Sequence, residues 1–180
     1  MSMPKAAQMI GVVTVAMLAT RANAHDDPRS PHLGTPMSKS EVAKWNRTIF
    51  PDGRGLPPGH GTAREGRALY VEKCASCHGD RGQGATAEDL VSGPEPPTAA
   101  KPSKAIGSYW PYATTIFDFI RRSMPPANPD TLSSDQTYAL TAYLLAANGI
   151  IGKSDEMNAR SLPKIKMPNR NGFIAIDAKK

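Results

Sequence analysis

The five residues Cys74-Ala75-Ser76-Cys77-His78 constrain this chain more than any other stretch. They match C-x-x-C-H, the spacing at which c-type haem is attached to a polypeptide. Two thiols at this spacing add to the two vinyl groups of the porphyrin, and the imidazole that follows lies under the iron as its proximal ligand. The chain has 2 cysteines in all. Cys74 and Cys77 therefore predict one covalently bound haem c, with His78 as a ligand of its iron.

Two other uses of a C-x-x-C pair agree less well with the sequence. A thioredoxin-like redox pair expects a βαβ pattern around it, which the flanking residues do not show. A structural zinc site needs a second pair of ligands, and no other cysteine remains to supply it. The motif therefore favours haem attachment over both alternatives.

Residues 1–24 have the pattern of a secretory signal peptide. Lys5 supplies the positive charge, residues 6–20 form the apolar stretch, and Ala22-Asn23-Ala24 is an A-x-A cleavage site. An uncleaved anchor is the alternative, but the apolar stretch is too short to span a bilayer. We expect a mature chain that begins at His25 in the bacterial periplasm and has no membrane span after cleavage.

The rest of the chain divides by composition into three parts. Residues 25–60 are rich in Pro and Gly and predict an extended arm, with one short helix from about Ser38 to Trp45 because Ser38-Lys39-Ser40-Glu41 can cap it. Residues 61–152 predict the haem domain. Residues 153–180 predict a polar C-terminal tail with a mild excess of Lys and Arg.

Three helices are expected within the haem domain. A capping box at residues 62–65 begins the first helix, which runs into the haem motif. Pro111 favours the start of a second helix, which must end before Met124-Pro125-Pro126 because a proline disfavours helical geometry in the residue before it. A capping box at residues 133–136 begins the third helix, and Asn148-Gly149 ends it.

This arrangement resembles the class I cytochrome c fold, in which the first helix crosses the last with a small residue and aromatic residues at the crossing. Gly66, Tyr70 and Tyr143 match that arrangement. The resemblance implies an all-α fold with three main helices around one covalent haem, here extended by the N-terminal arm and the C-terminal tail.

The same resemblance implies a sixth iron ligand. In class I cytochromes c it is a methionine just before the last helix, often followed by proline, and Met124 fits both conditions. A thioether is a soft ligand that raises the haem potential. Met167 is also followed by proline and stays open as an alternative, although it lies beyond the last helix. Met157 and the histidines His25, His32 and His60 lack a comparable context.

Weaker expectations concern the surroundings of the haem. The second ring nitrogen of His78 needs a hydrogen-bond acceptor, for which a carbonyl in the Gly93-Pro94 loop is a candidate. Tyr109 and Trp110 are candidates to donate to the haem propionates, and Arg121 or Arg122 to balance their charge. Core packing of the two aromatics and a solvated helix face for the arginines are the alternatives.

A more specific resemblance runs from about Ser38 to Phe173. The stretch Ile106-Gly-Ser-Tyr-Trp-Pro-Tyr-Ala-Thr-Thr-Ile-Phe-Asp-Phe-Ile-Arg-Arg-Ser-Met-Pro125 resembles the cytochrome subunit of bacterial Sox-type sulfur dehydrogenases and related sulfite dehydrogenase cytochromes. Residues 51–59 of the arm and 162–173 of the tail resemble the same family. The resemblance implies electron transfer from a molybdenum-cofactor subunit of the sulfite oxidase type to a small soluble cytochrome c, with arm and tail as binding elements.

The charge and the absence of further motifs argue against several other functions. The chain has a formal net charge of +6 but no basic helix and no nucleic-acid-binding motif, so a nucleic-acid partner is not expected. With His78 and Met124 on the iron, no axial position is left for a substrate, and the chain needs no catalytic residue of its own. The alternatives are a free diffusible electron carrier to a terminal oxidase and, from another class, a haem enzyme or gas sensor with an open sixth site.

Overall fold

The computed structural model describes residues 33–92 and 102–174, so the predicted signal peptide lies outside the described residues. The chain divides into two units, Met1–Lys39 and Ser40–Lys180. In the first unit the described residues, 33–39, are exposed. Helix α1 (Lys39–Trp45) occurs where the arm was predicted to be helical, and none of its residues is buried. All of the features below lie in the second unit.

The three predicted helices of this unit are α2 (Ala63–Lys73), α4 (Ala113–Ser123) and α5 (Ser134–Ala147). Both predicted capping boxes form, the first between Thr62 and Glu65 and the second between Ser133 and Gln136. Helix α4 begins two residues after Pro111 and ends at Ser123, since Met124 has an extended backbone. None of the helices in the described part of the chain has the length and apolar character needed to span a bilayer.

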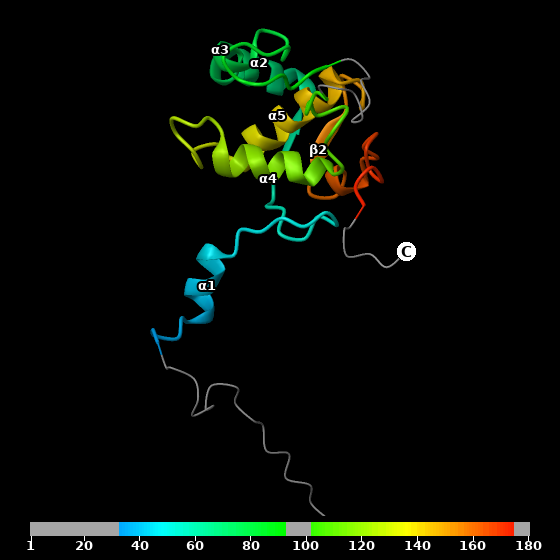
Figure 1. Ribbon diagram of the computed structural model, residues 1–180. Helices are drawn as coiled ribbons and strands as arrows, with labels where there is room; N and C mark the ends of the chain where they lie inside the picture. Colours follow the sequence, from blue (N-terminus) through cyan, green and yellow to red (C-terminus); the bar gives the residue numbers. More distant parts are fainter. Residues whose placement is uncertain (1–32, 93–101, 175–180) are drawn as a thin grey trace, which may run out of the picture. The chain divides into compact units, whose positions relative to one another are not determined.

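Helix α2 crosses α5 at the glycine that the sequence indicated (Figure 1). A Cβ atom added to Gly66 would lie 1.9 Å from the backbone oxygen of Ala139 and 2.8 Å from the Cβ atom of Tyr143. The rings of Tyr70 and Tyr143 pack beside this contact with their centroids 4.9 Å apart. The two backbones therefore approach as closely as they do because residue 66 has no side chain.

Helix α4 covers another side of α5 (Figure 1). Its fully buried Phe117 packs on the buried Tyr138 of α5, with ring centroids 4.4 Å apart. Burial of side chains of this size is the largest favourable term in the stability of a small domain. Helices α2, α4 and α5 thus share one apolar core, and these are the three main helices that the sequence predicted.

A small antiparallel sheet joins the segments on either side of the helical region. Strand β1 (His60–Thr62) pairs with β2 (Glu156–Asn158), and Gly61 lies opposite Met157. No sequence pattern predicted this sheet, because strands of three residues are too short to show an alternation of apolar and polar residues. The otherwise helical fold therefore includes a two-stranded ladder between the arm and the tail.

The tail is folded onto the core over much of its length. Its apolar residues Met157, Leu162 and Met167 are buried, and residues Leu162–Lys164 form a 3-10 helix, η1. The arm is attached in the same way, because Ile49 is buried and the Tyr138 hydroxyl donates to the Pro57 carbonyl at 2.9 Å. Both extensions thus contribute to the core as well as to the surface.

Candidate haem site

The haem motif lies on a single helical turn directly after α2. Helix α3 (Ala75–His78) follows Cys74, whose carbonyl accepts hydrogen bonds from the N–H groups of Cys77 and His78 at 3.2 and 2.9 Å. The Cys74 thiol is partly buried, whereas the Cys77 thiol is exposed. A helical turn brings residues three and four apart onto one face. The local structure therefore groups both thiols and the imidazole.

The loop after the motif folds back over it. The Ala87 N–H donates to the Cys77 carbonyl at 2.9 Å, and the Gly84 N–H donates to the His78 carbonyl at 2.8 Å. The Nδ1 atom of His78 lies 2.7 Å from the backbone oxygen of Glu88. This carbonyl fixes the ring orientation and leaves Nε2 as the nitrogen available to a metal.

The expected acceptor for this nitrogen was a carbonyl of the Gly93-Pro94 loop, and both of those residues lie outside the described residues. The acceptor found, Glu88, is only ten positions from His78. No local pattern indicated it, because a backbone carbonyl is available at every position of a loop.

An apolar cavity of about 500 Å³ opens beside the motif and is lined by Cys74, Cys77, His78 and Met124. Its walls come from α4, α5 and the intervening loops, and include Leu90, Ile106, Ile116, Phe119, Leu140 and Leu144. Cofactor sites usually have about 300–1,000 Å³ and mostly apolar walls. The size, the lining and the four ligand-type side chains fit a c-type haem.

The candidate sixth ligands lie in different places. Met124, directly after α4, lines this cavity. Met167 is buried in the core cluster and does not belong to the lining of the cavity. His60 lies in β1, away from the cavity lining, while His25 and His32 are outside the described residues.

Of the three predicted haem contacts, Tyr109, Trp110 and Arg121, only Trp110 lines the cavity. Trp110 lines the cavity, but its indole N–H already donates to the Lys104 carbonyl at 3.1 Å. Tyr109 packs its ring edge-on against Phe173, with centroids 5.3 Å apart, and its carbonyl accepts from Asn169. Neither Tyr109 nor Arg121 is part of the cavity lining.

Burial raises the pKa of the Cys74 thiol to about 11. A thiol that stays protonated at neutral pH is a poor nucleophile and a poor metal ligand, because both roles need the thiolate. The protein environment therefore does not prepare Cys74 for thioredoxin-like exchange.

The Tyr70 hydroxyl ties α2 to the residue that follows the motif. It is fully buried and donates to the Gly79 carbonyl at 2.8 Å, and its burial raises the pKa of the phenol to about 12. The phenol therefore remains a neutral donor throughout the physiological range. We expect Tyr70→Phe to lower the free energy of unfolding by about 1–3 kcal/mol, because the Gly79 carbonyl would stay buried without its partner.

Urea unfolding of the haem-loaded protein, followed by far-UV circular dichroism, measures this loss. Tyr143→Phe serves as the control, because Tyr143 packs on the same ring but no hydrogen bond of its hydroxyl is found within the described residues. Equal stability of the wild type and Tyr70→Phe would contradict the prediction.

Comparison with known proteins agrees with this geometry. Residues 61–144 match the family model of the cbb3-type cytochrome c oxidase subunit III. The chain is 32% identical over 110 residues to a thiosulfate dehydrogenase from Stutzerimonas stutzeri (strain A1501), covering 56% of this chain but only 35% of that relative. It thus spans about a third of that relative's length.

The solved structure of the sulfane dehydrogenase SoxCD from Paracoccus pantotrophus contains a chain similar to this one. The two superpose with a TM-score of 0.75 and 40% sequence identity, and the match covers 82% of this chain and 73% of the other. A match of this extent includes more than the helical region. The chain therefore belongs to the class I c-type cytochromes, in the group that resembles the cytochrome subunit of the Sox-type sulfur dehydrogenases.

Proposed function

We propose that this chain is a periplasmic cytochrome c with one covalent haem, which accepts single electrons from a molybdenum-cofactor subunit of the sulfite oxidase type and passes them to a small soluble cytochrome. The observation that carries the proposal is the cavity lined jointly by Cys74, Cys77, His78 and Met124. Two thiols, an imidazole and a thioether are the attachment and ligand groups of a low-spin electron-transfer haem.

Each of these four residues has a separate role. Cys74 and Cys77 hold the haem covalently through thioether bonds. His78, oriented by the Glu88 carbonyl, would offer its Nε2 atom to the iron, and Met124 would offer its thioether sulfur. When bound, haem c supplies an iron that alternates between the ferric and ferrous states. With His78 and Met124 both bound to the iron, no position would be left for a substrate.

The partner is suggested by the extent of the match to SoxCD and by the arm. Helix α1 exposes Val42 and Trp45, at 48% and 80% of their maximal surface. Large apolar side chains left in water are typical of contact sites with another protein.

The proposed partner reaction fixes how many electrons the carrier must take. When sulfite takes an oxygen atom from water to become sulfate, it releases two electrons and two protons. A one-electron carrier must therefore be reduced twice for each sulfite.

Purification of the tagged chain from its native host tests this function. We expect molybdenum to co-purify with it, and sulfite or thiosulfate to reduce the haem only while the molybdenum protein is present. Ascorbate reduction of the isolated cytochrome is the control for an intact haem. Absence of molybdenum from the purified protein, or equally fast reduction of the isolated chain by the sulfur compound, would contradict the proposal.

The covalent haem and the export are tested on the same preparation. The protein should be released by osmotic shock, begin at His25, and retain its haem in acidified acetone, which extracts a non-covalent haem. The pyridine haemochrome absorbance should give one haem for each chain. A haem that acetone extracts would contradict the attachment through Cys74 and Cys77.

A further inference from the structure

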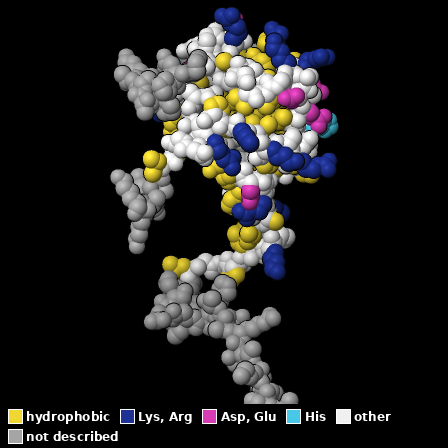
Figure 2. All heavy atoms as spheres, turned by 90° about the vertical axis from the view of Figure 1, so that its right-hand side faces the viewer, with side chains coloured by type: hydrophobic (Ala, Val, Ile, Leu, Met, Phe, Trp, Pro, Cys, Tyr) yellow, Lys and Arg dark blue, Asp and Glu magenta, His cyan; other side chains and the backbone are white. Residues whose placement is uncertain are grey.

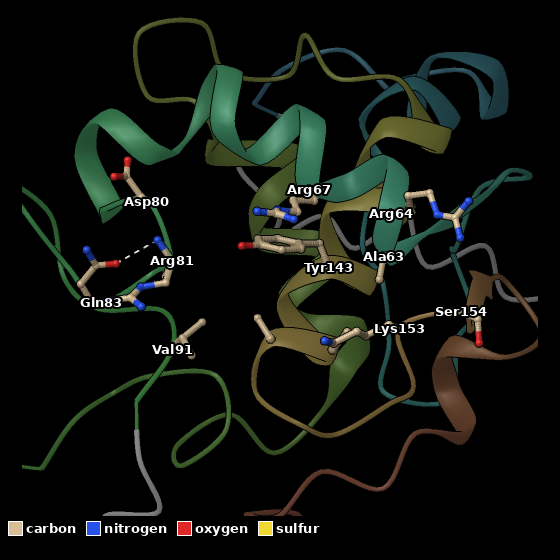
Figure 3. Close-up of a pocket in the computed structure, with 12 residues that line it drawn as sticks. Ala63, Arg64, Arg67, Asp80, Arg81, Gln83, Val91, Tyr143, Lys153 and Ser154 are labelled. Carbon is tan, nitrogen blue, oxygen red and sulfur yellow. Dashed lines mark hydrogen bonds between the residues drawn. The ribbon is translucent and has the colours of Figure 1, made fainter.

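A second concave site lies outside the haem cavity (Figure 3). It has a volume of about 870 Å³ and is formed by α2, the loop after the haem motif, the end of α5 and the segment that follows α5. It shares no lining residue with the haem cavity. The electron-transfer function described above does not use it.

The charged side chains around this hollow are mainly cationic, among neutral residues such as Ala146, Gln83 and Ser154. Arg64, Arg67, Arg81 and Lys153 line it together with a single carboxylate, Asp80. Figure 3 shows Arg67 and Lys153 on either side of the Tyr143 ring, while Arg81 lies on the loop across from that ring, with its side chain turned toward Gln83. Like charges repel one another when they are gathered in this way, and an anion placed among them removes that cost.

None of these four cations forms an ion pair with the residues that the structure describes. Other cations of the domain do have acidic partners, as in the pair of Arg47 with Asp130 and the pair of Arg122 with Asp118. Lys and Arg side chains are spread over the face of the molecule in Figure 2, with few acidic side chains between them. The hollow differs from such a surface because four cationic residues line one concave site.

The size of the hollow decides between classes of anion. A single small oxyanion needs donors that converge on a space of one ion, whereas these four cations are all exposed and line about 870 Å³. A peptide segment with several carboxylates fills such a volume, and each carboxylate can pair with a different cationic side chain. The half-buried Tyr143 ring supplies an apolar surface for the stems of its side chains.

We propose that the hollow lined by Arg64, Arg67, Arg81 and Lys153 is a docking site for an acidic peptide segment of a partner protein. It anchors the partner away from the haem cavity, so that the haem remains open to a second protein during the association. The proposal rests on the proposed function, because an electron carrier needs a protein partner. It depends on no particular sulfur compound.

The test uses the haem-loaded full chain and a short oligoglutamate peptide as the probe, titrated by calorimetry at low ionic strength. The double variant Arg67→Glu/Lys153→Glu should bind the peptide at least about tenfold more weakly than the wild type, since like charges then face the carboxylates. The control is Lys164→Glu/Lys166→Glu, which changes the net charge equally at exposed positions outside the hollow. It should bind within about twofold of the wild type.

Two further arms separate the sources of negative charge. Inorganic sulfate at matched ionic strength should show no stoichiometric binding. Binding of the peptide should disappear as the ionic strength rises from about 0.01 M to about 1 M, where charges act over only about 3 Å. Equal weakening in the two double variants, absence of peptide binding by the wild type, or tight binding of sulfate would each overturn the proposal. Because these titrations need no molybdenum protein, they can fail independently of the proposed function.

Discussion

Replacing Met124 with alanine should leave the haem attached but open one axial position of its iron. The ferric protein should lose the weak long-wavelength absorption band of a methionine-ligated haem, and the ferrous protein should bind carbon monoxide. The reduction potential should fall by at least about 0.1 V, because a thioether raises it and axial ligands set haem potentials over a range of about 0.8 V. Absorption spectra, a carbon monoxide titration and a redox titration measure these changes.

Met167→Leu is the matched control for this substitution. Met167 is also followed by proline and is buried, but it lies outside the cavity lining. Leucine has nearly the same volume, so the expected cost is below about 1.5 kcal/mol. The long-wavelength band and the potential should remain unchanged in this variant. If the band instead survives in Met124→Ala and is absent in Met167→Leu, then Met167 holds the iron.

The second large effect is expected at the helix crossing. Gly66→Ala should lower the free energy of unfolding by about 3 kcal/mol or more, since the new Cβ atom would lie 1.9 Å from the backbone oxygen of Ala139. Backbone atoms cannot move aside as a side chain does, so α2 and α5 must separate. The urea midpoint of the haem-loaded protein, followed by far-UV circular dichroism, measures the loss.

Ala68→Gly provides the comparison in the same helix. Ala68 is exposed in α2, and the change should cost only about 1 kcal/mol of helix propensity. Propensity alone predicts the opposite sign for Gly66→Ala, because alanine favours a helix more than glycine does. A stabilised Gly66→Ala variant would therefore show that the two backbones are not in contact at this position.

The helices of this fold could be predicted because their signals are local. Thr62 with Glu65, and Ser133 with Gln136, are capping boxes within four residues of sequence, and both form as expected. Pro125 ends α4 through its effect on the preceding residue, which is also local. Helix ends of this kind can be predicted from a single sequence, because the interacting residues are close to one another along the chain.

The contacts between distant segments could not be predicted in the same way. The pairing of Gly61 with Met157 joins residues on either side of the helical region, and neither strand is long enough to show alternation. The tail has scattered apolar residues, and burial of Met157, Leu162 and Met167 depends on surfaces that exist only after folding. For this reason the sequence of the tail predicted a solvent-exposed segment.

Some residues of the candidate site could likewise be predicted from local sequence, and others could not. Cys74, Cys77 and His78 follow from spacing, because the chemistry of attachment fixes their separation. Met124 required the resemblance to a family, since a lone methionine carries no motif. The carbonyl of Glu88 beside His78 belongs to no motif. The four cations around the hollow come from α2, the loop after the haem motif and the segment after α5, and only the structure places them together.

The β1–β2 ladder has a consequence for the ways in which this chain can be joined to others. Because His60 pairs with Asn158, the polypeptide enters and leaves the helical region at the same edge. Domains whose ends are close together tolerate insertion, duplication and circular permutation. Other polypeptide can therefore be joined to this protein at one edge, provided that the arm and the tail, which contribute Ile49, Leu162 and Met167 to the core, stay with the helical region.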